Sequence, residues 1–186
     1  SGDRLGEAEA YYRSGVDLQE QGRLEEAIAA YGEAVRLNPQ IAAAYAVYNN
    51  RGRSYMELRQ YKRAIQDLDE AIRLNSQYAA AYNNRGRSYA GLGNHKRAIQ
   101  ALDEAIRLNP QYASAYNHRG RSYASLDEHQ LAIQDLVEAI RLNPRRLSID
   151  DLTENIRLDT QLMMAFANRA IAYTLVGRDP EAKQVV

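Results

Sequence analysis

The chain has 186 residues, and its 24 Lys and Arg residues are balanced by 24 Asp and Glu residues. A zero net charge gives no field that would attract nucleic acid or an anionic membrane surface, so the arrangement of charges matters more than their sum. Cysteine is absent, which excludes disulfides and thiolate zinc sites, and no apolar run approaches the ~20 residues of a membrane helix. We therefore expect a cytoplasmic protein with no secretory leader, no membrane insertion and no nucleic-acid partner.

A short phrase recurs along the chain at a fixed period. The residues Ala-Ile-Arg-Leu-Asn occupy 71–75, 105–109 and 139–143, and each copy lies 34 residues after the last. A period of this size is typical of a stack of small units, in which each unit supplies part of the core of its neighbour. The period therefore predicts one continuous array over residues 1–186.

Within one unit, residues 79–112, the spacing predicts two amphipathic helices. In each half of the unit, core-type residues recur at spacings of three and four, which places them on one face of a helix. Gly93 predicts a turn between the helices, and Pro110 ends the second helix because proline cannot continue the backbone hydrogen bonds. Gly86 and Ala98 are small where the two helices of a hairpin would need to approach closely.

In chain order the pattern predicts four complete units, one single helix and one partial unit. Their boundaries are 8–41, 45–78, 79–112, 113–146, 147–162 and 163–186. Three additional residues within 40–48 interrupt the period, and since alanine favours helix, we expect the first helix of the second unit to be extended at its start. The second interruption leaves room for one helix, so residues near 148–158 are expected to form an unpaired helix, capped by Ser148.

The recurring positions resemble the signature of the tetratricopeptide repeat, which runs aromatic, small, Tyr, Ala, large, Ala and Pro. The third unit supplies these as Tyr82, Gly86, Tyr89, Ala98, Leu102, Ala105 and Pro110. The fourth unit supplies Tyr116, Gly120, Tyr123, Ala132, Leu136, Ala139 and Pro144. The resemblance covers nearly the whole chain, and it implies an all-α fold, a right-handed superhelical solenoid of antiparallel helix pairs.

The resemblance also implies that the first helix of each unit lines the concave side of the array. Residues interleaved with the core positions of these helices are the candidates for ligand contact. An Asn amide can both donate to and accept from a peptide backbone, and an Arg guanidinium fits a carboxylate. Since packed helices lie about 8–10 Å apart and an extended chain rises about 3.3 Å per residue, one Asn would meet roughly every third residue of a bound peptide. The candidates are Asn49, Asn50, Arg53, Asn83, Asn84, Arg87, Asn117, His118, Arg121 and Asn168.

Two binding modes known in this family match the chain to different degrees. The clamp that holds the carboxyl-terminal tails of cytosolic chaperones starts with a basic residue and an Asn, where this chain has Tyr12 and Val16, so the complete clamp is absent. The asparagine ladder of a glycosyltransferase repeat arm matches better. The residues at its positions are Asn50, Asn84 and Asn168, with His118 interrupting the run.

The candidate residues also allow a structural interpretation. The Asn side chains could be solvated polar residues multiplied by duplication, and the Arg residues of the candidate set could pair with acids of neighbouring units. A second arginine series is expected to point toward the helix interface and to form structural ion pairs. Its members are Arg51, Arg85, Arg119 and Arg169.

No arrangement of residues predicts catalysis, a cofactor or a metal site. The chain has no nucleophile with an acid/base partner, no Gly-rich phosphate loop and no metal-binding spacing of its histidines with nearby carboxylates. We therefore expect a non-enzymatic protein-interaction module with a protein or peptide partner, acidic segments being among the candidates, that acts as an adaptor or scaffold. The alternatives are a scaffold that self-associates through its irregular C-terminal end and, disfavoured by the neutral charge, a helical-repeat binder of RNA.

Overall fold

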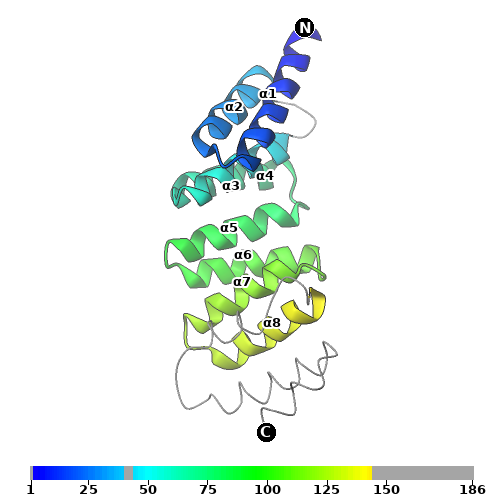
Figure 1. Ribbon diagram of the computed structural model, residues 1–186. Helices are drawn as coiled ribbons and strands as arrows, with labels where there is room; N and C mark the ends of the chain where they lie inside the picture. The colour runs from blue at the N-terminus through cyan, green and yellow to red at the C-terminus, as the bar shows by residue number, and fades with distance from the viewer. Residues whose placement is uncertain (1, 40–43, 144–186) are drawn as a thin grey trace, which may run out of the picture. The chain divides into compact units, whose positions relative to one another are not determined.

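The computed structural model describes residues 2–39 and 44–143, and all regular secondary structure in these residues is α-helical (Figure 1). This confirms the all-α fold class. The predicted helix at 148–158 and the partial unit at 163–186 lie outside the described residues, as does the segment 40–43 of the first interruption. The helices are α1 (Gly2–Glu20), α2 (Leu24–Leu37), α3 (Ala44–Glu57), α4 (Tyr61–Leu74), α5 (Ala79–Gly91), α6 (His95–Leu108), α7 (Ala113–Ala124) and α8 (His129–Leu142).

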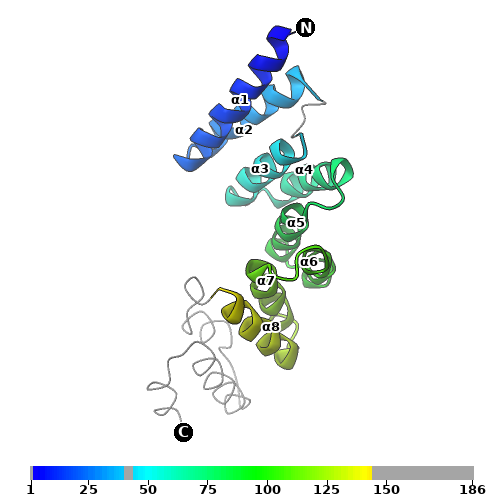
Figure 2. The same cartoon turned by 90° about the vertical axis from the view of Figure 1, so that its right-hand side faces the viewer.

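The chain divides into two compact units, residues 1–94 and 95–186, so the division falls between α5 and α6. In the first unit α1 packs against α2 and α3 against α4, and α5 then packs against α4 (Figures 1 and 2). In the second unit α7 packs against α8, and α6 against α7. Each unit therefore consists of neighbouring helices that share their apolar faces, as a repeat array requires.

Small residues allow the paired helices to approach closely. A methyl group on Gly52 of α3 would lie 3.0 Å from Leu68 Cγ and 3.3 Å from the carbonyl oxygen of Ala64 on α4. Gly120 of α7 stands in the same relation to Leu136 of α8, with its added methyl 3.0 Å from Leu136 Cγ. The repeated glycine therefore makes room for the fully or almost fully buried leucine of the partner helix.

The second helices end at an asparagine, as the sequence predicts. The backbone N–H groups of Asn38, Asn75, Asn109 and Asn143 each donate to the carbonyl of the alanine four residues earlier, at 2.9–3.1 Å. Asn38, Asn75 and Asn143 have left helical geometry, with φ between −142° and −147°. None of the described helices is long and apolar enough to cross a membrane.

The interface arginines form the ion pairs that the sequence predicts. Arg51 of α3 binds Asp67 of α4 through two hydrogen bonds of 2.7 Å, and Arg119 of α7 binds Asp135 of α8 in the same way. Hydrogen bonding to these aspartates is the main reason that the pKa of both arginines is raised. Each guanidinium also lies over a tyrosine ring one turn earlier, 5.3 Å from Tyr48 and 5.5 Å from Tyr116.

Candidate functional site

In the first unit, α3 and α5 supply six of the predicted contact residues. Asn49, Asn50 and Arg53 lie on α3, and their equivalents one period later, Asn83, Asn84 and Arg87, lie on α5. The structure gives these side chains unequal access to solvent. Arg53 is exposed, Asn50 and Arg87 are half-buried, and the other three asparagines are buried, with 3–6% of their surface exposed.

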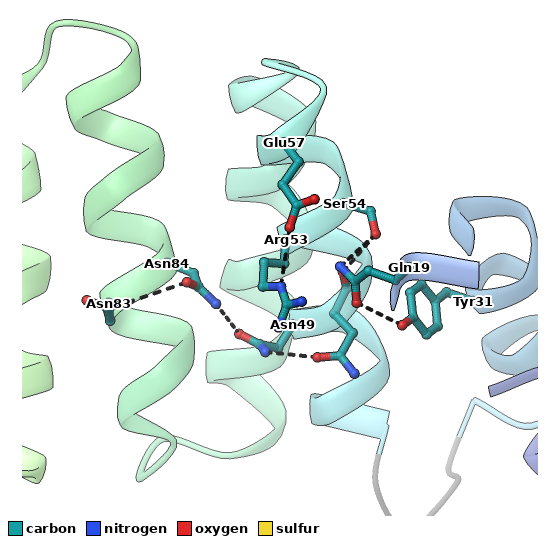
Figure 3. Close-up of polar contacts among 9 residues, drawn as sticks. Gln19, Tyr31, Asn49, Arg53, Ser54, Glu57, Asn83 and Asn84 are labelled. Carbon is teal, nitrogen blue, oxygen red and sulfur yellow. Dashed lines mark hydrogen bonds and ion pairs between the residues drawn. The ribbon is translucent and has the colours of Figure 1, made fainter. Parts of the chain in front are cut away.

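The four asparagines form a hydrogen-bonded chain, which we term the amide ladder. Figure 3 labels Asn83, Asn84 and Asn49 of this chain. Asn83 Nδ2 donates to Asn84 Oδ1 at 3.5 Å, and Asn84 Nδ2 donates to Asn49 Oδ1 on the neighbouring helix at 3.0 Å. Asn49 Nδ2 donates to Asn50 Oδ1 at 3.3 Å, and Asn50 Nδ2 donates to the hydroxyl of Tyr12 on α1 at 3.4 Å. The ladder therefore joins α5 to α3 and α3 to α1.

Burial of these amides is possible because they bond to one another, and only Asn83 Oδ1, at the α5 end, is buried without a partner among the described residues of the ladder. A buried amide without partners is unfavourable by about 1–3 kcal/mol, so a polar layer between first helices is tolerated only if the side chains bond across the helix boundary. The bond from Asn84 to Asn49 meets this requirement. The asparagines thus connect successive repeats, and direct contact of Asn49, Asn83 or Asn84 with a ligand stays a prediction.

A second polar cluster lies at the α1 end of the ladder and was not predicted from the sequence. Gln19 Oε1 accepts from the Tyr31 hydroxyl at 3.0 Å, and Gln19 Nε2 donates to Ser54 Oγ at 2.9 Å (Figure 3). Burial is the main cause that raises the pKa of Tyr31, so its hydroxyl stays protonated and donates to Gln19. One signal in the sequence was available, because Tyr12 occupies the repeat position held by Asn49 and Asn83 in the next two units.

The arginines of the candidate set differ from the asparagines in their surroundings. Arg53 Nε lies 3.5 Å from Glu57 Oε1, and both side chains are more than 40% exposed. An exposed pair of this kind contributes little to stability, typically less than about 1 kcal/mol. The Arg53 guanidinium can therefore exchange this partner for a ligand carboxylate at small cost, whereas Arg87 is half-buried and already engaged with other residues.

In the second unit, α7 supplies Asn117, His118 and Arg121. Arg121 is exposed, and Asn117 and His118 are half-buried. Asn117 Oδ1 is buried and has no hydrogen-bond partner among the described residues, while His118 interacts with other residues. Asn168, the remaining predicted residue, lies outside the part of the chain that the structure describes. In the described ranges no three His, Asp or Glu side chains are placed to hold a metal ion.

Models of the tetratricopeptide repeat match the chain over residues 8–41, 49–113 and 84–146, which together cover well over half of its length. The chain belongs to the tetratricopeptide repeat family. The resemblance inferred from the sequence is therefore confirmed, and with it the membership in a family of helical protein-interaction modules.

Solved structures agree with this assignment. The chain is similar to a crystal structure of MamA, with 25% identity and a TM-score of 0.68 over 100% of this chain and 89% of that one. It is also similar to TTC0263, a tetratricopeptide repeat protein of Thermus thermophilus, with 24% identity and a TM-score of 0.71 over 95% of both chains. A third similar structure is the first repeat domain of Spaghetti (RPAP3) bound to the HSP90 peptide SRMEEVD, with 24% identity and a TM-score of 0.62 over 66% of this chain and 94% of that one.

Proposed function

We propose that this chain binds an extended peptide segment of a partner protein along the first helices of its repeats and acts as an adaptor or assembly scaffold. The observation that carries the proposal is the recurrence of arginine at one position of these helices. Arg53, Arg87 and Arg121 follow one another at 34 residues, and Arg53 and Arg121 reach solvent. Arginine at an exposed, repeated position suits carboxylates that are spaced along an extended chain.

The asparagines and arginines have different parts in this proposal. Asn49 and Arg53 lie one turn apart on α3, so the guanidinium stands on the same face as the amide ladder (Figure 3). The buried Asn49, Asn83 and Asn84 hold the first helices in register, and the more accessible groups contact the peptide. In the second unit Asn117, His118 and Arg121 belong to the proposal by their equivalent repeat positions, as does Asn168 further along the chain.

An acidic segment is the partner that this chemistry favours. Guanidinium groups pair best with carboxylates, and amide side chains can add hydrogen bonds to the peptide backbone. The repeat domain of RPAP3 provides a precedent, since the peptide that it holds, SRMEEVD, contains three acidic residues. A peptide held by several weak polar contacts would bind reversibly, as an adaptor requires.

The test is a titration of labelled acidic heptapeptides, and of copies with Glu and Asp replaced by Gln and Asn, followed by fluorescence anisotropy. We expect Arg53→Ala and Arg121→Ala each to weaken binding of the acidic peptides about tenfold, because each removes one charge-assisted contact of an exposed guanidinium. Arg73→Ala is the matched control, since Arg73 is also exposed and paired with a glutamate of its own helix, Glu70, but lies on a second helix, α4. Unchanged affinity in both variants, or no binding of any peptide, would refute the proposal.

Self-association through the C-terminal end remains the alternative proposal. The residues that suggested it, 147–186, lie outside the described part of the chain. A molar mass that rises with concentration in light scattering would support it, and a constant monomer mass would contradict it.

A further inference from the structure

The hydrogen bonds of the amide ladder all run in one direction. From Asn83 through Asn84, Asn49 and Asn50, each side-chain N–H donates toward α1, and the last acceptor is the hydroxyl of Tyr12. Bonds aligned in this way polarise one another and strengthen the last donor of the chain. The Tyr12 hydroxyl, at the α1 end of the ladder, is therefore the acceptor of the Asn50 N–H.

The Tyr12 hydroxyl can also act as a hydrogen-bond donor. A hydroxyl that accepts a bond through its oxygen still has one proton to donate. Within residues 2–39 and 44–143 the Tyr12 hydroxyl accepts from Asn50 and donates to no other group. Tyr31, its neighbour, differs in this respect, because the Tyr31 hydroxyl donates to Gln19 inside the molecule.

The ring of Tyr12 is held in place by packing against buried residues of α1, α2 and α3. Its centroid lies 6.1 Å from that of Tyr31, with the planes tilted by 44°, and the residue as a whole is half-buried. An aromatic ring fixed by packing loses little conformational entropy when its hydroxyl contacts a ligand. The donor at the end of the ladder is therefore already oriented before a ligand arrives.

The charges near this end favour an anionic acceptor. Burial is the main reason for the raised pKa of Tyr31, and the neighbouring Tyr12 adds to it. Arg53 lowers this pKa more strongly than Glu20 raises it. The Arg53 guanidinium is therefore near enough to act on the Tyr31 hydroxyl, whose ring lies beside that of Tyr12. A carboxylate would find both a cationic side chain and a proton donor at this end of the ladder.

We propose that the Tyr12 hydroxyl is a specificity-determining contact, which donates its proton to a carboxylate oxygen of the bound segment. This inference rests on the proposed peptide-binding function and deepens it, since it adds α1 to the recognition face. It also assigns a role to the ladder: Asn50 occupies the Tyr12 oxygen, so that the phenol can act toward the ligand only as a donor.

The experiment starts from an array of heptapeptides with free carboxyl termini. The strongest binder of the wild-type chain is then made with each acidic side chain changed to its amide, and separately with an amidated C-terminus. We expect Tyr12→Phe to weaken the parent peptide about tenfold, as loss of one hydrogen bond to a charged acceptor would. We also expect it to abolish the preference for one particular carboxylate, and the amide series identifies whether that group is a side chain or the C-terminus.

Tyr11→Phe is the matched control, because Tyr11 lies on the same helix, is exposed, and undergoes the same chemical change. A third variant, Asn50→Asp, offers the Tyr12 proton an acceptor inside the protein. It should weaken binding, and adding Tyr12→Phe to it should have no further effect. Thermal melts followed by circular dichroism show whether each variant is folded.

Three results would overturn the inference. The first is a carboxylate preference that is the same in Tyr12→Phe as in the wild type, and the second is a parent peptide that shows no carboxylate preference at all. The third is a double variant whose loss equals the product of the two single losses. In all three cases peptide binding itself stands, whereas an array with no binder would overturn the proposed function and this inference with it.

Discussion

Arg51 and Arg85 occupy the same repeat position but form ion pairs with different aspartates. Arg51 pairs with Asp67, which is largely buried, whereas Arg85 pairs with Asp69, whose side chain is 52% exposed. In the sequence, Ala101 stands 34 residues after Asp67, so the third repeat has no acid at that position. Arg85 Nε is accordingly buried without a partner among the described residues. Equivalent residues of a repeat protein can therefore contribute unequally to stability.

We expect Arg51→Met to lower the free energy of unfolding by about 3 kcal/mol, because it leaves the carboxylate of Asp67 buried without its charge partner. Arg85→Met should lower it by about 1 kcal/mol or less, since Asp69 regains water. Urea unfolding followed by circular dichroism measures both values. The exposed Arg73 provides a control, for which Arg73→Met should change stability by less than about 0.5 kcal/mol. Equal losses for Arg51 and Arg85 would contradict the role of burial.

Single residues were predictable from the sequence to different extents. The direction of Arg51 and Arg119 toward the helix interface followed from their place in the repeat, and their ion pairs confirm it. The burial of Asn84 did not follow, because its partner Asn49 lies 35 residues away on another helix. Helix periodicity gives the face on which a side chain lies, but not the neighbour that covers it.

Among the elements, the turns that follow α1, α3, α5 and α7 share one backbone conformation. The residues at this position have positive φ, namely Gly22, Arg59, Gly93 and Asp127, with values of 57–75°. Glycine adopts this left-handed conformation without strain, whereas a residue with a side chain is destabilised by about 1 kcal/mol or more. Gly93 was predicted to mark a turn, and it does so for this reason.

We expect Arg59→Gly to raise the free energy of unfolding by up to about 1 kcal/mol, because it removes the strain of a left-handed arginine, less the greater entropy of glycine in the unfolded chain. The reverse change at the equivalent position, Gly93→Arg, should lower stability by a similar amount. Both are measured by urea unfolding. A loss of stability in Arg59→Gly would mean that the arginine side chain contributes more than the backbone strain removes.

On the scale of the molecule, the second helices repeat a surface ion pair between residues three apart. A glutamate precedes an arginine of the last turn, where a cation also interacts favourably with the helix dipole. In every pair the hydrogen bond to arginine is the largest cause that lowers the pKa of the glutamate. The pairs are Glu33–Arg36, Glu70–Arg73, Glu104–Arg107 and Glu138–Arg141, each with a contact of 2.6 Å.

These pairs predict how stability depends on pH. A carboxyl group whose pKa is lower in the folded than in the unfolded chain stabilises the fold above its unfolded pKa, about 4.3 for glutamate. This contribution is lost as the pH falls through the folded value. We therefore expect the urea midpoint to fall as the pH is lowered from about 5 to 3, and to fall less in high salt. Replacing all four glutamates by glutamine should flatten this dependence, and an unchanged slope in that variant would refute the assignment.

The sequence by itself determined the helical repeat, its 34-residue period, the family and the interface arginines, because these depend on local spacing within one helix or one hairpin. Tertiary structure decided which polar groups face solvent and which face one another. The sequence places Asn49, Asn83 and Asn84 among the candidates for ligand contact. Packing of α5 on α3 and of α3 on α1 buries these side chains in the amide ladder. A hydrogen bond between helices needs two side chains within about 3 Å, and only the packing of those helices sets that distance.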